Sequence, residues 1–316
     1  MRNKSSEQGW LLEREKVLSL EFATIYRAIL NESAAFLFLC FYFFMEYVRP
    51  QTIYPELNIL PFSFLAIVFT FVFLPFDNIK KHPVNFLVFS VYGFMFLRIV
   101  SSSYSIDEKV AAEQVYIYYN WILLVYATLM LVVNEKRFVL FLFLYLLWNF
   151  KMSQHGAIAW AQRGFGFAGW GMGGPMGWFQ NSGEYGLQMA MVCMISLGLY
   201  IGIKQHLNGW RKYLVIAIPV TSFMSVLSSS SRGDYLALIA GLLWIAVTEK
   251  GKKVKALLYI AIVIGVGYLA VPNEMLQRFT VAGNDDDYTS YTRETRWKAG
   301  YEIFKENMLI GVGTGA

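Results

Sequence analysis

Two groups of arginines have the chemistry and the local setting of an anion-binding site. In the first, Arg232 follows the four serines 228–231, of which Ser231 is its direct neighbour, and an apolar stretch begins three residues later. A guanidinium offers five N–H donors, and together with nearby hydroxyls it suits the oxygens of a phosphate. The alternative interpretation is an arginine at a membrane interface, with the serines capping the start of a helix.

The second group lies in residues 291–315. Arg293 and Arg296 are three residues apart, so in a helix both guanidinium groups can converge on one anionic ligand. Thr292 is the expected N-cap of this helix. One face of the helix would hold Arg293, Trp297, Tyr301 and Phe304. The alternative is an amphipathic helix that rests on the membrane with its arginines among the lipid headgroups.

Further polar residues lie near the start of another apolar run. The segment 179–184 (FQNSGE) places Asn181 and Glu184 at its mouth, and polar residues in membrane proteins line cavities more often than they face lipid. His155 has the type of a general base but no partner at a suitable spacing. The acidic run 284–287 lacks the spaced ligands of a calcium loop. We expect neither a metal nor another cofactor.

The amino-acid composition indicates what kind of helices must position these residues. Of the 316 residues, 56% are hydrophobic and only 16% are charged, against about 45–50% and about 25% in soluble domains. The apolar residues form long runs almost free of charge, which excludes an ordinary soluble enzyme and predicts an all-α, polytopic membrane protein. The nine predicted spans are 33–48, 60–76, 84–100, 115–133, 137–152, 183–203, 212–231, 233–249 and 255–272. The span 137–152 is predicted to be cut short by Lys151.

The distribution of basic residues predicts the orientation. Eleven Lys and Arg residues lie in one alternating set of short loops and six in the other, so the first set is expected to be cytoplasmic. Residues 1–32 then form a cytoplasmic amphipathic segment, and residues 33–271 form the membrane bundle. A Gly- and Trp-rich loop, 153–182, lies on the outer side. The segment 272–316 begins a large outer loop, so every candidate site residue lies at an outer end.

Three stretches of sequence carry a resemblance to a known family. These are FQNSGEYGLQMA, SSSSRGDYLALIAGLLWIAV and TRETRWKAGYEIFKENMLIGVGTG, which together fall within residues 179–316. In this order, the chain resembles the O-antigen ligase and polymerase superfamily of bacterial inner-membrane glycosyltransferases. The N-terminal half is similar to that family in hydropathy alone.

The resemblance implies a transferase that works at the periplasmic surface. The donor would be a glycan on undecaprenyl diphosphate, whose anomeric carbon is attacked by an acceptor hydroxyl. The acceptor is a lipid A-core sugar in ligases, another lipid-linked glycan in polymerases and a protein hydroxyl in some relatives. The family's diphosphate-binding arginines correspond to Arg232 and Arg293, with Arg296 as a helper. Ser231, Asn181 and Glu184 are the other expected substrate-binding residues, membrane lipid is a further partner, and nucleic acid is not expected.

The sequence departs from the family at its C-terminal end. Family members continue past the Gly-Val-Gly segment with outer loop that carries a functional histidine, and then with further helices. We therefore expect residues 1–316 to be a fragment that lacks the general base and is inactive alone. Met308 stands where the family usually has a proline. Three alternatives stay open: a polymerase, a transporter of lipid-linked glycan, against which the outer position of the polar residues argues, and a scaffold without catalysis.

Overall fold

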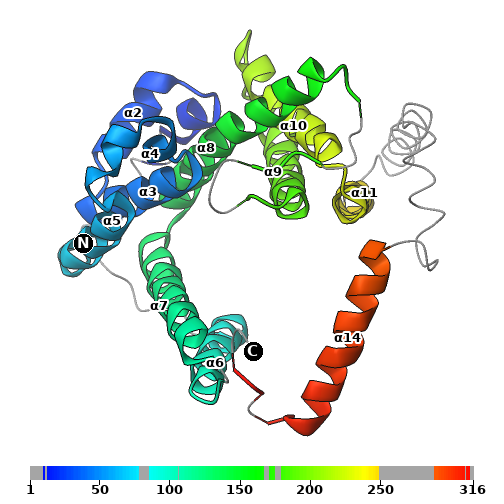
Figure 1. Cartoon of the computed structure of the whole chain (residues 1–316). Coiled ribbons are helices and arrows are strands. Elements are labelled where there is room, and N and C mark those ends of the chain that lie inside the picture. The colour runs from blue at the N-terminus through cyan, green and yellow to red at the C-terminus, as the bar shows by residue number, and fades with distance from the viewer. Residues whose placement is uncertain are drawn as a thin grey trace. The chain divides into compact units, whose positions relative to one another are not determined.

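The computed structural model describes residue 10 and the ranges 13–77, 85–105, 107–166, 171–174, 179–248, 288–309 and 311–313 (Figure 1). Within these ranges the regular elements are helices, without a strand, as the all-α prediction requires. The chain divides into two compact units. The first comprises Met1–Ser33, Cys40–Ala66 and Asn134–Leu276, and the second comprises Ala34–Leu39, Ile67–Val133 and Gln277–Ala316. The domain boundaries predicted from the sequence stay predictions.

The helices of the first unit come from two parts of the chain, residues 22–59 and residues 135–248. They are α2 (Phe22–Leu30), α4 (Pro50–Ile53), η1 (Pro55–Ile59), α8 (Glu135–Gln162), α9 (Ser182–Ile203), α10 (Arg211–Ser228) and α11 (Arg232–Thr248). The second unit contains η2 (Leu74–Phe76), α6 (Phe86–Ser102), α7 (Glu108–Leu131) and α14 (Tyr288–Glu306). Two helices contribute residues to both units, α3 (Ala34–Tyr47) and α5 (Phe62–Phe73).

Eight of the nine predicted spans fall on described helices, and the ninth, 255–272, lies outside the described residues. Among the described helices, α7 and α9 are long and apolar enough to cross a membrane, and the bent pair Phe22–Leu30 and Ala34–Ile53 counts as a third candidate. Phe62–Phe76 and Phe86–Ser102 are apolar but shorter. These helices support a membrane protein, and the number of nine spans stays a prediction.

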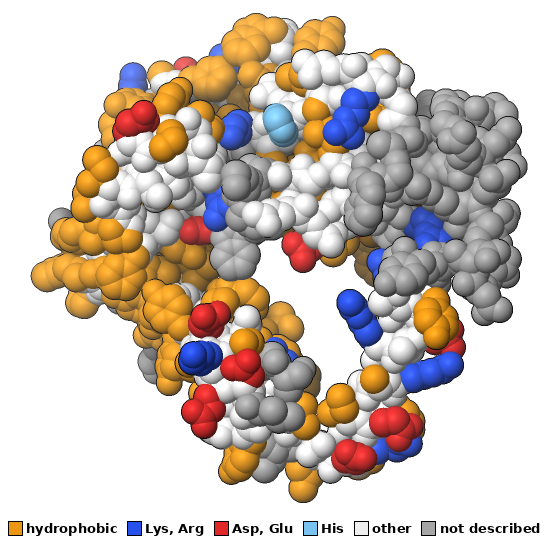
Figure 2. All heavy atoms as spheres, viewed as in Figure 1, with side chains coloured by type: hydrophobic (Ala, Val, Ile, Leu, Met, Phe, Trp, Pro, Cys, Tyr) orange, Lys and Arg blue, Asp and Glu red, His pale blue; other side chains and the backbone are white. Residues whose placement is uncertain are grey.

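Large hydrophobic side chains cover much of the helix surface, as the orange areas of Figure 2 show. On α5 these include Phe64 and Val72, and on α6 they include Phe89 and Phe96, all more than half exposed. Exposed apolar surface of this extent is unfavourable in water. It is the surface expected of helices whose solvent is lipid.

The structure corrects the predicted end of the span 137–152. Helix α8 continues through Lys151 to Gln162. Lys151 does not break the helix, because its side chain projects outward and its Nζ donates to the Val48 carbonyl at 3.3 Å. Residues 153–162, His155 included, therefore belong to α8 and not to the Gly- and Trp-rich loop. Ala157 and Trp160 of this extension are buried.

In the first unit, α9 packs against α10 and α11, and α10 packs against α8. The starts of α8 and α10 and the end of α9 share one end of this unit. There Arg137 pairs with Glu32, Arg211 donates to the Ser19 carbonyl, and Ile203 packs with residues from 207–215 and from the N-terminal segment. At the other end, the Tyr185 hydroxyl donates to the Met152 carbonyl. These three helices thus alternate in direction, as predicted, while the side of the membrane that each end faces stays a prediction.

Candidate anion site

The first candidate arginine lies at a tight turn between two helices. Helix α10 ends at Ser228 and α11 begins at Arg232, so three serines make the connection. Ser230 has a φ of 51°, in the left-handed region that non-glycine residues adopt uncommonly. Such a conformation costs of order 1–3 kcal/mol and persists only where the surroundings enforce it. The arginine is therefore presented by a turn that neighbouring contacts must hold.

Asp234 supplies these contacts. The Ser229 hydroxyl donates to Asp234 Oδ2 at 2.9 Å, and the Ser231 side chain also hydrogen-bonds to this carboxylate. The Ser231 amide donates to Ser229 Oγ at 3.4 Å. Asp234 is only 4% exposed, which is unusual for an acidic side chain. The carboxylate thus links Ser229 and Ser231, which lie on either side of Ser230 in the turn.

Sequence reasoning missed Asp234. The sequence does place Asp234 in the first turn of an apolar helix, where an acidic side chain interacts favourably with the helix N-terminus. The burial of the carboxylate and its two serine partners could be found only from the structure. Asp234 belongs to the support of the site, since its oxygens are occupied by hydroxyls of the turn.

Helix α9 packs closely against the Asp234 carboxylate. A Cβ atom on Gly186 would overlap Asp234 Oδ2 and would lie 2.6 Å from Ser229 Oγ. Glycine at this position therefore allows the close approach of α9 to the start of α11. The 171–174 segment crosses the same end of the unit, since the Met172 amide donates to the Ser228 carbonyl at 3.0 Å.

The predicted residues Asn181 and Ser231 lie near each other in the first unit. Asn181 is the N-cap of α9, and its side-chain oxygen accepts from the Gly183 amide at 2.8 Å. A Cβ atom on Gly183 would lie 3.6 Å from Ser231 Oγ. Capping uses the Asn181 carbonyl oxygen and leaves its amide group, on an exposed residue, for another partner. Glu184 is exposed in the first turn of α9.

Buried polar side chains also lie deeper in this unit, so the polar residues are not confined to the outer ends. Gln188 Nε2 donates to Tyr145 Oη at 2.9 Å and to Asn149 Oδ1 at 3.0 Å. The Asn149 side chain is fully buried and donates to the Tyr145 carbonyl at 2.9 Å. This network joins α8 to α9 and satisfies its own polar groups.

Arg293 and Arg296 lie on α14, in the second unit. This helix begins at Tyr288, so Thr292 lies inside it, and the prediction of Thr292 as N-cap is wrong. The reason is local: neither Pro nor Gly interrupts residues 288–299, so the helix extends one turn further toward the N-terminus. Both arginines are exposed.

The charged residues of α14 divide into paired and unpaired groups. Glu294 pairs with Lys298 and Glu302 pairs with Lys305, each at 2.7 Å. The hydrogen bond and charge of Lys298 lower the pKa of Glu294 below its usual range. Among the described residues, no carboxylate forms an ion pair with Arg293 or Arg296. Their guanidinium groups are therefore available to an external anion, and the convergence of Arg293 with Arg232 stays a prediction.

The fold and the composition define a helical membrane protein with an arginine-bearing turn. Residues 217–316 match the family model described as O-antigen ligase, which supports the resemblance to the O-antigen ligase superfamily that the sequence motifs indicate. The matched region includes the turn of Arg232 and helix α14 with Arg293 and Arg296. No curated protein and no solved structure matches the chain.

Proposed function

We propose that this protein is a membrane glycosyltransferase of the O-antigen ligase type. It transfers a glycan from undecaprenyl diphosphate to an acceptor hydroxyl, on lipid A-core or a similar molecule, at the periplasmic face of the bacterial inner membrane. The observation that carries this proposal is the family match over residues 217–316, which contain all three candidate arginines. General membrane glycosyltransferase chemistry follows from the family, and the donor, the acceptor and the membrane face are our proposal.

In the proposed reaction, the acceptor oxygen forms a bond to the anomeric carbon of the donor glycan. The bond between that carbon and the diphosphate oxygen breaks, and its electron pair stays with the diphosphate. Negative charge therefore grows on the leaving group as the reaction proceeds. Arg232 and Arg293 stabilise this charge with fixed hydrogen-bond donors, and Arg296 assists them.

The remaining candidates bind the glycan and orient the donor. The amide group of Asn181 and the hydroxyl of Ser231 lie at the same end of the first unit as Arg232, and they can donate to phosphate or sugar oxygens. Glu184 is an exposed carboxylate, so it accepts hydrogen bonds from sugar hydroxyls. A general base outside this set of residues takes the hydroxyl proton of the acceptor.

The turn of Arg232 supports this function, because a preorganised donor needs little rearrangement during the reaction. The contacts of Asp234 with Ser229 and Ser231 fix the residues on both sides of the turn. A site on a rigid helix end positions its groups more accurately than a site on a free loop.

The test is to substitute Arg232 and Arg293 separately by Ala in the chromosomal gene of the source bacterium and to measure glycan attached to its acceptor on the cell surface. Loss of one fixed donor to a developing charge typically lowers the rate about 10²–10³-fold, so each variant should lose most of the attached glycan. Lys298→Gln, an exposed charge change on α14, is the matched control and should keep wild-type levels. Normal glycan in both arginine variants would eliminate the proposed mechanism.

The polymerase alternative uses the same arginines with a different acceptor, since the superfamily that the chain resembles includes both kinds of transferase. The product distinguishes the two functions. Loss of a ligase leaves long glycan on its lipid carrier, whereas loss of a polymerase leaves single repeat units attached to the acceptor.

A further inference from the structure

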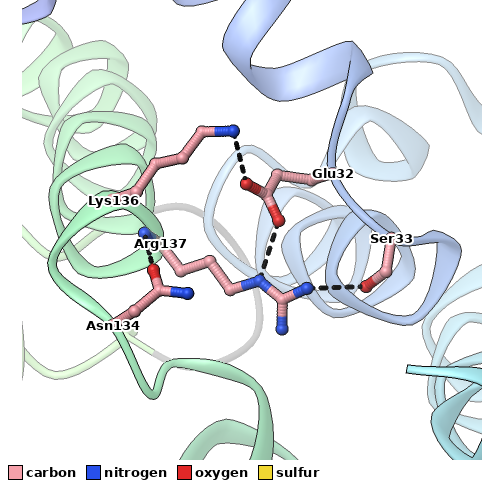
Figure 3. A network of polar contacts seen from close by, with 5 residues as sticks. All are labelled: Glu32, Ser33, Asn134, Lys136 and Arg137. Atoms are coloured by element: carbon pink, nitrogen blue, oxygen red, sulfur yellow. Dashed lines mark hydrogen bonds and ion pairs between the residues drawn. The ribbon is translucent and has the colours of Figure 1, made fainter. Parts of the chain in front are cut away.

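The N-terminal segment is fixed to the end of the first unit at which α8 begins. Glu32 Oε1 lies 2.8 Å from Lys136 Nζ, and Glu32 Oε2 lies 2.8 Å from Arg137 Nε (Figure 3). Arg137 also donates through Nη2 to Ser33 Oγ at 3.2 Å, and its amide donates to the capping Asn134 side chain at 2.8 Å. The side chains of Glu32 and Arg137 are only 8% and 10% exposed, so these contacts hold the connection between α2 and α3 firmly in place.

This connection turns the chain sharply. The helices Phe22–Leu30 and Ala34–Ile53 are bent by 117° relative to each other. The second of them is part of a candidate membrane span, so α2 runs across the direction of that span. Helices in this orientation, with an apolar face, lie in the plane of a membrane interface.

A second segment extends the surface of α2. The ring of Trp210 stacks on Phe22 with 5.9 Å between centroids, and Arg211 Nη1 donates to the Ser19 carbonyl at 3.1 Å. Large apolar side chains remain exposed on both segments. They are Phe22 (53%), Tyr26 (64%) and Leu30 (56%) on α2, with Trp210 (59%) and Tyr213 (64%) at the start of α10. We call these five residues, together with the exposed cations Arg27, Lys204 and Lys212, the basal patch.

The charge of the basal patch is positive. Arg27 is the one charged residue of α2, and residues 204–213 (KQHLNGWRKY) contain Lys204, Arg211 and Lys212 without an acidic residue. Arg27, Lys204 and Lys212 are exposed. Lys212 Nζ lies over the Tyr213 ring at 4.9 Å from its centroid. The neighbouring Glu21, which accepts a hydrogen bond from Thr24 Oγ1 at 3.1 Å, is acidic, but the cations named above outnumber it.

Aromatic rings beside exposed lysine and arginine are the composition of a surface that meets lipid headgroups. Trp and Tyr are enriched at membrane interfaces, where each ring has an apolar body and a polar edge. Lys and Arg place their apolar stems along such a surface and extend their charges to the phosphates. From this geometry we infer that the basal patch binds the anionic phosphodiester headgroups of a phospholipid bilayer. The inference is independent of the proposed glycosyltransferase activity.

The test uses the full chain, purified in a mild detergent and equilibrated with an equimolar mixture of phosphatidylglycerol and phosphatidylcholine. The ratio of the two lipids bound to the protein is measured by mass spectrometry of the intact complex. We expect phosphatidylglycerol to be enriched, with a factor of roughly five for each cation near the anionic headgroup. The triple variant Arg27→Gln, Lys204→Gln and Lys212→Gln should lose this enrichment.

A matched variant removes the same charge elsewhere. Lys109→Gln, Lys298→Gln and Lys305→Gln changes three exposed lysines outside the basal patch, and it should keep the enrichment. Helicity measured by circular dichroism verifies that both triple variants are folded. Equal binding of the two lipids by the wild-type chain would overturn the inference, as would enrichment that survives in the basal-patch variant. Displacement of the bound lipid by excess inorganic phosphate would show a soluble-anion site and would also overturn it.

Discussion

At the scale of single residues, the support beneath Arg232 depends on Asp234. Its carboxylate is buried and accepts from Ser229 Oγ at 2.9 Å, while Ser230 between the two helices adopts a left-handed φ of 51°. The arginine itself is half-buried and would contact the ligand. Asp234 is therefore a positioning residue, which acts on the ligand through the turn.

We predict that Asp234→Ala destabilises the protein by about 1–3 kcal/mol, because the turn loses the hydrogen bonds that link the buried carboxylate to the Ser229 and Ser231 side chains. Thermal unfolding of the purified chain in detergent measures this change. Thr248→Ala, an exposed position at the far end of α11, is the control and should change the stability much less. An unfolding temperature for Asp234→Ala equal to that of the wild type would show that the carboxylate does not hold the turn.

At the scale of the helices, the close contact of α9 with α11 depends on a glycine. Gly186 leaves no room for a Cβ atom beside Asp234, whereas Gly198 on the same helix has nothing within 4 Å of an added Cβ. The two glycines differ in their surroundings alone, so they form a matched pair for substitution.

We predict that Gly186→Ala costs about 1–3 kcal/mol of stability, the usual range for overpacking, and displaces the Arg232 turn. Gly198→Ala should be neutral or stabilising by up to about 1 kcal/mol, because alanine favours the helix over glycine. Thermal unfolding of both variants under the same conditions is the measurement. Equal effects of the two substitutions would mean that the approach of α9 to Asp234 is looser than the structure indicates.

The helices were largely predictable from the sequence, and the contacts between them were not. Apolar runs located six of the eight helices to within three residues at each end, whereas α7 begins seven residues before its predicted span and α8 continues past Lys151 for ten residues beyond its predicted span. The sequence predicts that Lys151 cuts its span short, yet the helix continues and Lys151 Nζ donates to the Val48 carbonyl. The pairing of Gly186 with Asp234 joins residues 48 positions apart, and neither residue type shows in the sequence which partner it meets. The buried network of Asn149 and Gln188 was missed for the same reason.

At the scale of the whole molecule, the proposed function requires cooperation between the two units. Arg232 belongs to the first unit, and Arg293 and Arg296 belong to the second. The family match includes both arginine-bearing regions, so one domain type contains them in this order. A single diphosphate can bridge them only if the two guanidinium groups open onto the same space at the outer leaflet.

The distance between positions 232 and 293 tests this claim most directly. Arg232→Cys and Arg293→Cys, introduced together, carry spin labels, and pulsed electron resonance measures their separation in a lipid bilayer; the native Cys40 and Cys193 are both buried. Two arginine side chains around one diphosphate can span roughly 15 Å between backbone positions, by the reach of extended chains. We expect a separation within this reach after allowance for the length of the labels. A population held much further apart in the bilayer would contradict the shared site.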